Sequence, residues 1–552
     1  MRRSRGVIVF VAACMMGGCR GEAGEGAASP AAERMMLMDG LGDLTFPVST
    51  TVVEAQRFFD QGLRLTWAFN HAEAVRSFRE AQRLDPDCAM CWWGEAFALG
   101  PNINAGMDSA SGVAAHDAIV RAAEHKGAAA DIERALIDAL ALRYAHVPPA
   151  DRAALDSAWA QAIGDVARAH PESDEVAVLQ ADAQMNLSPW DYWIDGSTPK
   201  PNGAIAIAGL ERVLQRSPDH PGACHLFIHA VEKTQPDRAI PCAERLPALM
   251  PAAGHIVHMP AHIYIRVGRY ADAVERNIHA THADDAILQD LTPDGVYRLG
   301  YYPHNHHFLS FAASMAGMSA QALESARNTA AAVDTSLMRV PELMALQHYA
   351  VYPLYALVRF GRWDDILAWP TPPGDLPYML GAWHYARALA LLDGGRFDEA
   401  ETALQALRTA GADPAIAEAR IWGLNSATAL LDIADDVVTG EMAAARSDWN
   451  TAVARLRAAV AKEDALTYDE PPTWSIAARH NLGAVLLAAG RPSEAELVYR
   501  ADLEVYRENG WSLFGLAQAL DAQGRTADAE AVRARFGTAW AAADLALPAS
   551  RF

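Results

Sequence analysis

Residues 55–88 read AQRFFDQGLRLTWAFNHAEAVRSFREAQRLDPDC. Gly62 and Ala74 are small, Phe78 follows Ala74 by one helical turn, and Pro86 stands near the end. Small side chains at these positions let two helices approach closely, and an aromatic ring fills the space between them. Proline then stops the second helix, because it lacks the backbone N–H. The stretch therefore predicts a pair of antiparallel helices.

The same pattern recurs at residues 254–287, 381–413 and 476–509. A Gly-Arg-aromatic triplet marks the corner between the helices of a pair, at 268–270, 361–363 and 395–397. Glycine at such a corner ends the first helix in a left-handed conformation. A single pair cannot bury its apolar face alone, so neighbouring pairs must stack. The pattern resembles the tetratricopeptide repeat (TPR), which implies an all-α fold, a right-handed superhelical array of antiparallel helix pairs.

The bulk composition indicates a folded protein of considerable size. The chain has 552 residues, 51% of them hydrophobic and 21% charged, and it is too long for one compact core. One continuous helical array accounts for this length. The formal net charge of −22 argues against a nucleic-acid partner, because binding would begin with repulsion from the phosphates.

The N-terminus has the features of an export signal. Basic residues MRRSR precede the short apolar stretch 7–18, which is too short to span a bilayer. The sequence Met16-Gly17-Gly18-Cys19 resembles a bacterial lipobox, which implies that Cys19 carries a lipid. We expect a lipid anchor in the bacterial outer membrane, with the protein facing the periplasm. The alternative is an ordinary cleaved signal peptide and a secreted or periplasmic protein.

Composition and repeat register together predict five sections. They are a lipoprotein signal peptide (1–19), a flexible tether (20–45), N-terminal repeats with a divergent part (46–200), histidine-rich central repeats (201–340) and C-terminal repeats (341–552). Cys88 and Cys91 lie one helical turn apart, which fits either a local disulfide or two buried thiols.

Three further segments extend the resemblance beyond the repeat itself. HMPAHIY (258–264), YYPHNHHF (301–308) and YDEPPTW (468–474) are similar to segments of a family of exported bacterial proteins known by their tetratricopeptide repeats. This resemblance runs from about Phe46 to the end of the chain. The resemblance implies the fold and the export, and it does not indicate an activity.

Histidines are concentrated in the central section. Eleven of the 19 lie between His220 and His307, where an even distribution would place about 3. In tetratricopeptide arrays the first helix of each pair lines the concave groove. By that resemblance, seven histidines of three consecutive pairs face the groove: His225, His229, His255, His258, His262, His304 and His307.

This arrangement points to a transition metal, zinc or copper. The i, i+4 spacing of His225/His229 and of His258/His262 presents two imidazoles to one ion. Ligands from two helices would leave a coordination position open for hydrolytic or redox chemistry. Glu232 is a candidate ligand or general base, and Tyr264 a candidate for orienting a substrate.

Two questions stay open at the level of sequence. Pro260 lies between His258 and His262, so the helix there either begins near Met259 or is kinked. The segment 468–474 contains paired carboxylates that either hold a cation or belong to a loop between repeats. The alternative function is a non-enzymatic scaffold that binds a partner protein or peptide in the groove. Whether the protein is an enzyme is not decided by these patterns.

Overall fold

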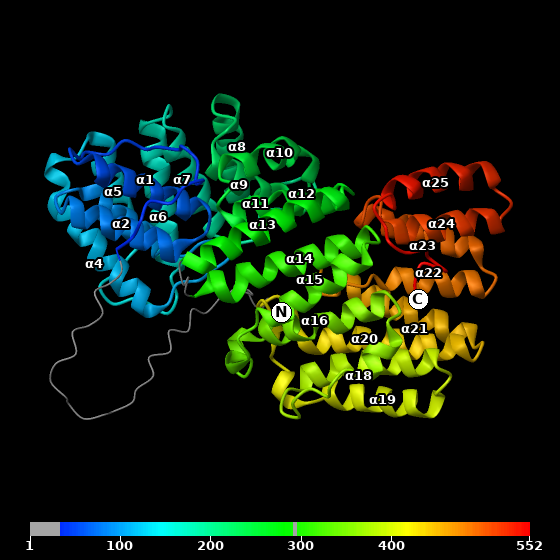
Figure 1. Cartoon of the computed structure of the whole chain (residues 1–552). Helices are drawn as coiled ribbons and strands as arrows, with labels where there is room; N and C mark the ends of the chain where they lie inside the picture. The colour runs from blue at the N-terminus through cyan, green and yellow to red at the C-terminus, as the bar shows by residue number, and fades with distance from the viewer. Residues whose placement is uncertain (1–33, 291–294) are drawn as a thin grey trace, which may run out of the picture. The chain divides into compact units, whose positions relative to one another are not determined.

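The structure is a computed structural model that describes residues 34–290 and 295–552 (Figure 1). The predicted signal peptide, with its lipidation site Cys19, lies outside these residues. Within them helices joined by loops and turns predominate, and β1 (Arg420–Ile421) and β2 (Asn425–Ser426) form a small antiparallel ladder. The prediction of an all-α, solenoid-type fold of helix pairs is confirmed.

The helices fall into two compact units. The N-terminal unit comprises the described residues 34–260, 282–290 and 295–298, and the C-terminal unit comprises 261–281 and 299–552. In each unit most helices pack against the next helix along the chain, as α1 does on α2 and α18 does on α19. The division falls within residues 201–340, which the sequence predicted as one section.

The N-terminal unit begins with the helix pair predicted from residues 55–88. Its α-helices are α1 (Val53–Trp67), α2 (His71–Leu84), α3 (Ala89–Ala98), α4 (Ser109–His125), α5 (Asp131–Ala141), α6 (Ala153–Ala169), α7 (Asp174–Asn186), α8 (Pro201–Arg216), α9 (Pro221–Val231), α10 (Ile240–Leu249) and α11 (Gly254–His258). Short 3-10 turns lie at η1 (Lys126–Ala128) and η2 (Pro236–Ala239).

Two helices have residues in both units: α12 (Pro260–Arg266) and α13 (Tyr270–Asp290), as does the π-helical turn η3 (Tyr297–Tyr301). The C-terminal unit continues with α14 (Tyr302–Met315), α15 (Ser319–Ala331), α16 (Ala345–Arg359), α17 (Trp363–Leu367), α18 (Pro377–Asp393), α19 (Phe397–Gly411), α20 (Ala427–Ala445), α21 (Trp449–Asp464), α22 (Ala478–Ala488), α23 (Pro492–Val505), α24 (Gly510–Ala522) and α25 (Thr526–Ala539). Its 3-10 turns are η4 (Thr335–Leu337), η5 (Pro341–Leu343) and η6 (Pro414–Ile416).

Close approach of the helices depends on glycine at the predicted positions. The ring of Phe78 on α2 is fully buried between Gly62 on α1 and Gly94 on α3. A Cβ atom added at Gly62 would lie 2.8 Å from that ring, and one at Gly94 would lie 2.3 Å from it. Tyr499 on α23 takes the same place between two glycines of the C-terminal unit. The small-residue pattern therefore has the steric role that the sequence predicted.

The corners of the pairs are also as predicted, with two exceptions, Phe69 after α1 and Ser447 after α20. Glycines with φ between 59° and 81° end the first helices, at positions 268, 317, 361, 395, 490 and 524. The corner between α1 and α2 carries Phe69 instead, with φ of 56°. A side chain in this left-handed region costs about 1–2 kcal/mol, so Phe69 is under strain that glycine would avoid.

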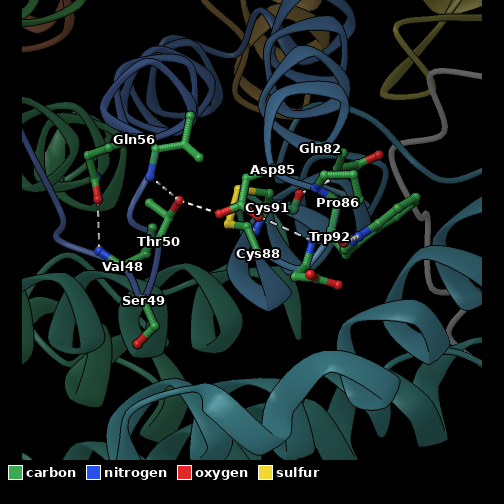
Figure 2. Close-up of a disulfide and its surroundings, with 12 residues drawn as sticks. Val48, Ser49, Thr50, Gln56, Gln82, Asp85, Pro86, Cys88, Cys91 and Trp92 are labelled. Carbon is green, nitrogen blue, oxygen red and sulfur yellow. Dashed lines mark hydrogen bonds between the residues drawn. A yellow bond between two sulfur atoms is a disulfide. The ribbon is translucent and has the colours of Figure 1, made fainter.

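Cys88 and Cys91 form a disulfide at the start of α3, which decides between the two predicted alternatives (Figure 2). The Asp85 carboxylate just before it accepts a hydrogen bond from the Thr50 hydroxyl. The thiols of Cys224 and Cys242 are free and buried.

Part of the predicted tether is packed rather than solvated. Met35 and Leu41 are buried, and the backbone N–H of Met38 donates to Gln61 Oε1 at 2.7 Å. Arg64 donates to the carbonyl of Leu44 at 2.6 Å. The prediction of a flexible tether over 20–45 is therefore wrong for residues 34–45. Its composition concealed the two buried apolar side chains, Met35 and Leu41, and the hydrogen bonds to α1.

Pro260 interrupts the helix around the second histidine pair. Helix α11 ends at His258, and α12 begins with Pro260 as its first residue. The i, i+4 argument therefore holds for His225 and His229 on the continuous helix α9. For His258 and His262 the two helices are separated only by Met259, which keeps helical φ and ψ of −49° and −36°.

Among the described residues, none of the helices combines the length and the apolar character needed to cross a bilayer.

Candidate metal centre

Three histidines of the N-terminal unit converge in its interior. His225 and His229 lie one turn apart on the same face of α9, and His255 is the second residue of α11. All three side chains are buried. One ligand nitrogen from each lies within 4.8 Å of the other two. We call His225, His229 and His255 the histidine trio.

The proton on His225 is fixed by its neighbour. Its Nδ1 lies 2.6 Å from the carbonyl oxygen of Trp67, which can only accept a hydrogen bond. Nδ1 therefore carries the proton, and Nε2 presents a lone pair. Burial, with the nearby charge of His258 in a lesser role, lowers the pKa of His225 to about 4. The imidazole is neutral at pH 7, which is the form that binds metals.

His229 faces an acidic partner on the same helix. Its Nδ1 lies 3.6 Å from Oε2 of Glu232, whose side chain is fully buried. A carboxylate behind the far ring nitrogen is the arrangement that orients many metal-bound histidines. The predicted residue Glu232 is therefore placed behind the histidine trio.

The spacing of the three nitrogens suits a small divalent ion. Nε2 of His225 lies 3.1 Å from Nε2 of His229 and 3.2 Å from Nε2 of His255. Nitrogens bound to one zinc ion at about 2.0–2.1 Å in tetrahedral geometry are about 3.3 Å apart. The lone pair on Nε2 of His225 can accept a hydrogen bond from only one of these two imidazoles at a time, so His229 and His255 compete for it. A bound metal ion would remove this competition.

Phe69 covers the trio. Its ring centroid lies 4.4 Å from that of His225, 5.4 Å from that of His255 and 6.0 Å from that of His229. This is the residue that replaces glycine at the strained corner after α1. Sequence reasoning missed Phe69, although an aromatic residue in place of the corner glycine was a visible signal.

The loop between α7 and α8 adds a second aromatic cover. Trp190, also with positive φ (62°), has its ring 5.0 Å from the ring of His229. Its Nε1 donates to the carbonyl of Ile103 at 3.0 Å, and Trp193 Nε1 donates to the carbonyl of Ala230 at 2.8 Å. Strained backbone at functional sites is a recurrent observation, and both strained aromatics here contact the same trio.

The four other predicted ligands are not members of the trio. His258 has its ring centroid 6.0 Å from that of His255. In the C-terminal unit, His262 and His304 have ring centroids 5.7 Å apart. His307 packs against Tyr352, with ring centroids 4.1 Å apart.

Tyr264, predicted to orient a substrate, packs against an arginine side chain. Its side chain is buried, and the Arg269 guanidinium lies 4.3 Å from the centroid of its ring. This contact is a cation–π interaction between residues of the C-terminal unit.

The segment 468–474 contributes a buried acid that sequence reasoning left undecided. Oε2 of Glu470 lies 2.7 Å from Nδ1 of His262, and Oε1 accepts from the Tyr468 hydroxyl. Burial raises the pKa of Glu470 to about 8, against the opposing effects of Arg266 and Tyr468. Glu470 therefore partners a predicted ligand, 208 residues away in sequence.

No protein-family description matches the sequence. A search of curated proteins likewise yields no match. Solved structures similar to the chain include the human IFIT1 dimer with m7Gppp-AAAA, at 11% identity, covering 89% of this chain and 90% of that chain with a TM-score of 0.31. They also include the APC/C hetero-tetramer Cut9-Hcn1, at 12% identity, covering 88% and 73% with a TM-score of 0.32. The function proposed below rests on the residues of this chain alone.

Proposed function

We propose that the N-terminal unit binds one transition metal ion through Nε2 of His225, His229 and His255. The observation that carries the proposal is the convergence of these three nitrogens, with Nδ1 of His225 held by the Trp67 carbonyl. A histidine that only filled space would not need its tautomer fixed so that the lone pair faces two other imidazoles. Glu232 supports the second ligand, His229, from behind.

The donor set favours zinc or copper. Neutral imidazole binds both, and the trio offers no thiolate or oxygen ligand of its own. Three protein ligands would leave one position for water or a substrate. An ion so placed would lower the pKa of bound water, or in the case of copper would cycle between redox states. The cover by Phe69 and Trp190 favours retention of the ion over rapid turnover.

The test is metal content and affinity in the purified full-length protein without a histidine tag. After stripping and reloading with zinc or copper, we expect one ion per chain by inductively coupled plasma mass spectrometry. His225→Ala and His255→Ala should each lower the affinity at least about 100-fold, because a ligand is lost rather than a supporting contact. Far-UV circular dichroism should stay unchanged.

A matched control is His71→Ala in the same unit. His71 also has Nδ1 bonded to a backbone carbonyl, that of Ala98 at 2.7 Å, and a pKa near 4 caused by burial. His71 is not part of the trio, so the His71→Ala variant should bind metal as the wild type does. If His71→Ala were as damaging as His225→Ala, the trio would have no special status. Sub-stoichiometric metal after reloading would overturn the proposal.

The scaffold alternative stays a prediction, because no contact among the described residues identifies a partner. The lipid anchor at Cys19 and the outer-membrane location are likewise proposals, supported by the lipobox-like sequence before Cys19.

A further inference from the structure

Arg359, near the end of α16, is a buried cation. Its side chain is only 5% exposed. Nη1 donates to Nδ1 of His480 at 2.9 Å, Nη2 approaches the Met315 sulfur at 3.7 Å, and the guanidinium carbon lies 3.7 Å from the centroid of the Trp511 ring. Among the described residues none of these partners is a carboxylate, and Nε of Arg359 has no hydrogen bond. Buried charges in proteins are nearly always paired, so this arrangement needs an explanation.

An acid, Asp502, lies on the other side of His480. Oδ2 of Asp502 is 2.9 Å from Nε2 of His480, on the far side of the imidazole from Arg359. It also accepts hydrogen bonds from Asn509 and Ser512. Since Arg359 donates to Nδ1, the His480 proton is on Nε2 and the ring is neutral. Burial lowers the pKa of Arg359 to about 9 despite the attraction of Asp502, so the guanidinium is still charged at pH 7.

Arg359 lines a cavity of about 250 Å³ within the C-terminal unit. Glu441, a second buried charged group at this cavity, has partners of its own. Glu441 accepts from Asn481 Nδ2 at 2.7 Å and pairs with Arg551 at 2.8 Å. The remaining wall is largely apolar or aromatic and includes Trp363, Tyr385, Leu389, Ile476 and Val485. Arg359 is therefore the buried charge at the cavity that lacks a direct counter-ion.

We propose that this cavity binds a small organic anion, a monocarboxylate with a compact apolar body. The guanidinium fork matches a carboxylate in shape and charge. The apolar wall would take the hydrocarbon part of the ligand, and the volume limits it to a compact molecule. The site is separate from the histidine trio and does not depend on the metal.

The test uses the full-length protein in the presence of a metal chelator. Benzoate and hexanoate are titrated calorimetrically against their uncharged amides, benzamide and hexanamide, and inorganic phosphate tests for a general anion site. We expect at least one acid to bind about 10-fold or more tightly than its amide, and more tightly than phosphate. Arg359→Met should remove this preference. The control Arg396→Met removes a surface cation paired with Glu399 and should keep it.

Two further variants separate loss of acid binding from loss of folding and from loss of metal binding. Ala444 lies on the rim of the cavity, and Ala444→Trp should block binding while Arg359 stays in place and the circular dichroism is unchanged. His225→Ala should bind the acid as the wild type does, so failure of the metal proposal leaves this result intact. Failure of both acids to bind, equal affinity for acid and amide, or unchanged preference in Arg359→Met would each overturn the proposal.

Discussion

His225 shows how one hydrogen bond defines a candidate ligand. The Trp67 carbonyl places its proton on Nδ1, and burial keeps the ring neutral. The acceptor Trp67 lies on α1, 158 residues earlier in sequence. The pattern of histidines could predict the pair on α9, but not the acceptor that fixes the tautomer.

The depressed pKa of His225 predicts a pH dependence of stability. Its ordinary pKa of 6.5 applies to the unfolded chain, whereas the folded value is about 4. Below pH 6.5 the unfolded chain takes up a proton that the folded protein refuses, so stability is lost as the pH falls from 6.5 to 4. The loss from this group is up to about 3 kcal/mol. We compare the free energy of unfolding by urea at pH 7 and at pH 4.5 in the metal-free protein. The loss of stability at pH 4.5 should be smaller in His225→Phe than in the wild type. An equal loss in both proteins would contradict it.

Phe69 predicts an unusual response to glycine. Phe69→Gly relieves backbone strain of about 1–2 kcal/mol but removes a buried ring worth about 3–5 kcal/mol, so we expect net destabilisation. Ser447 is an exposed residue with φ of 59°, and Ser447→Gly should stabilise by roughly 1 kcal/mol because little packing is lost.

Thermal unfolding separates the two effects. Metal release from Phe69→Gly should also be faster than from the wild type, since the cover over the trio is gone. Stabilisation by Phe69→Gly, with unchanged metal release, would mean that the ring has no role at the trio.

At the scale of elements, the sequence predicted the helix pairs well because their signals are local. Gly62, Phe78 and the corner glycines lie within one repeat, and their steric roles follow from spacing. The break at Pro260 and the packing of residues 34–45 were harder to predict. Each depends on which other part of the fold the segment packs against, and the residues of that part lie far away in the sequence.

The two glycines around Phe78 give a test of helix packing. Gly94→Ala places a methyl group 2.3 Å from the Phe78 ring, so we expect destabilisation by about 1–3 kcal/mol from overpacking. Gly537 on α25 has no atom within 4 Å of an added Cβ. Gly537→Ala should therefore stabilise by roughly 0.5–1 kcal/mol through helix propensity. The unfolding midpoints of the two variants should move in opposite directions, and a parallel shift would refute the packing account.

At the scale of the whole molecule, each unit contains its own buried polar centre. The N-terminal unit has the histidine trio, and the C-terminal unit has the Arg359 cavity and the His262–Glu470 pair. Sequence reasoning predicted one site with seven histidines. It could not single out the trio or the His262–Glu470 pair, because each depends on tertiary packing within its unit, in the second case between segments 208 residues apart.

Export and anchoring are tested on the intact chain in a bacterial host. We expect the mature wild-type protein to begin at a lipid-modified Cys19 and to fractionate with the outer membrane. Cys19→Ser should leave the protein unmodified at this position and absent from the outer-membrane fraction. Mass spectrometry of the N-terminal peptide provides the measurement. A mature protein that begins elsewhere, without lipid, would favour an ordinary signal peptide.

Zinc K-edge X-ray absorption of the zinc-loaded protein tests the central claim most directly. We predict three imidazole nitrogens at about 2.0–2.1 Å and one further light ligand, with one nitrogen lost in His255→Ala. Scattering from sulfur at about 2.3 Å would instead place the ion at Cys224 and Cys242. That result, or a failure to retain zinc, would contradict a metal centre built from His225, His229 and His255.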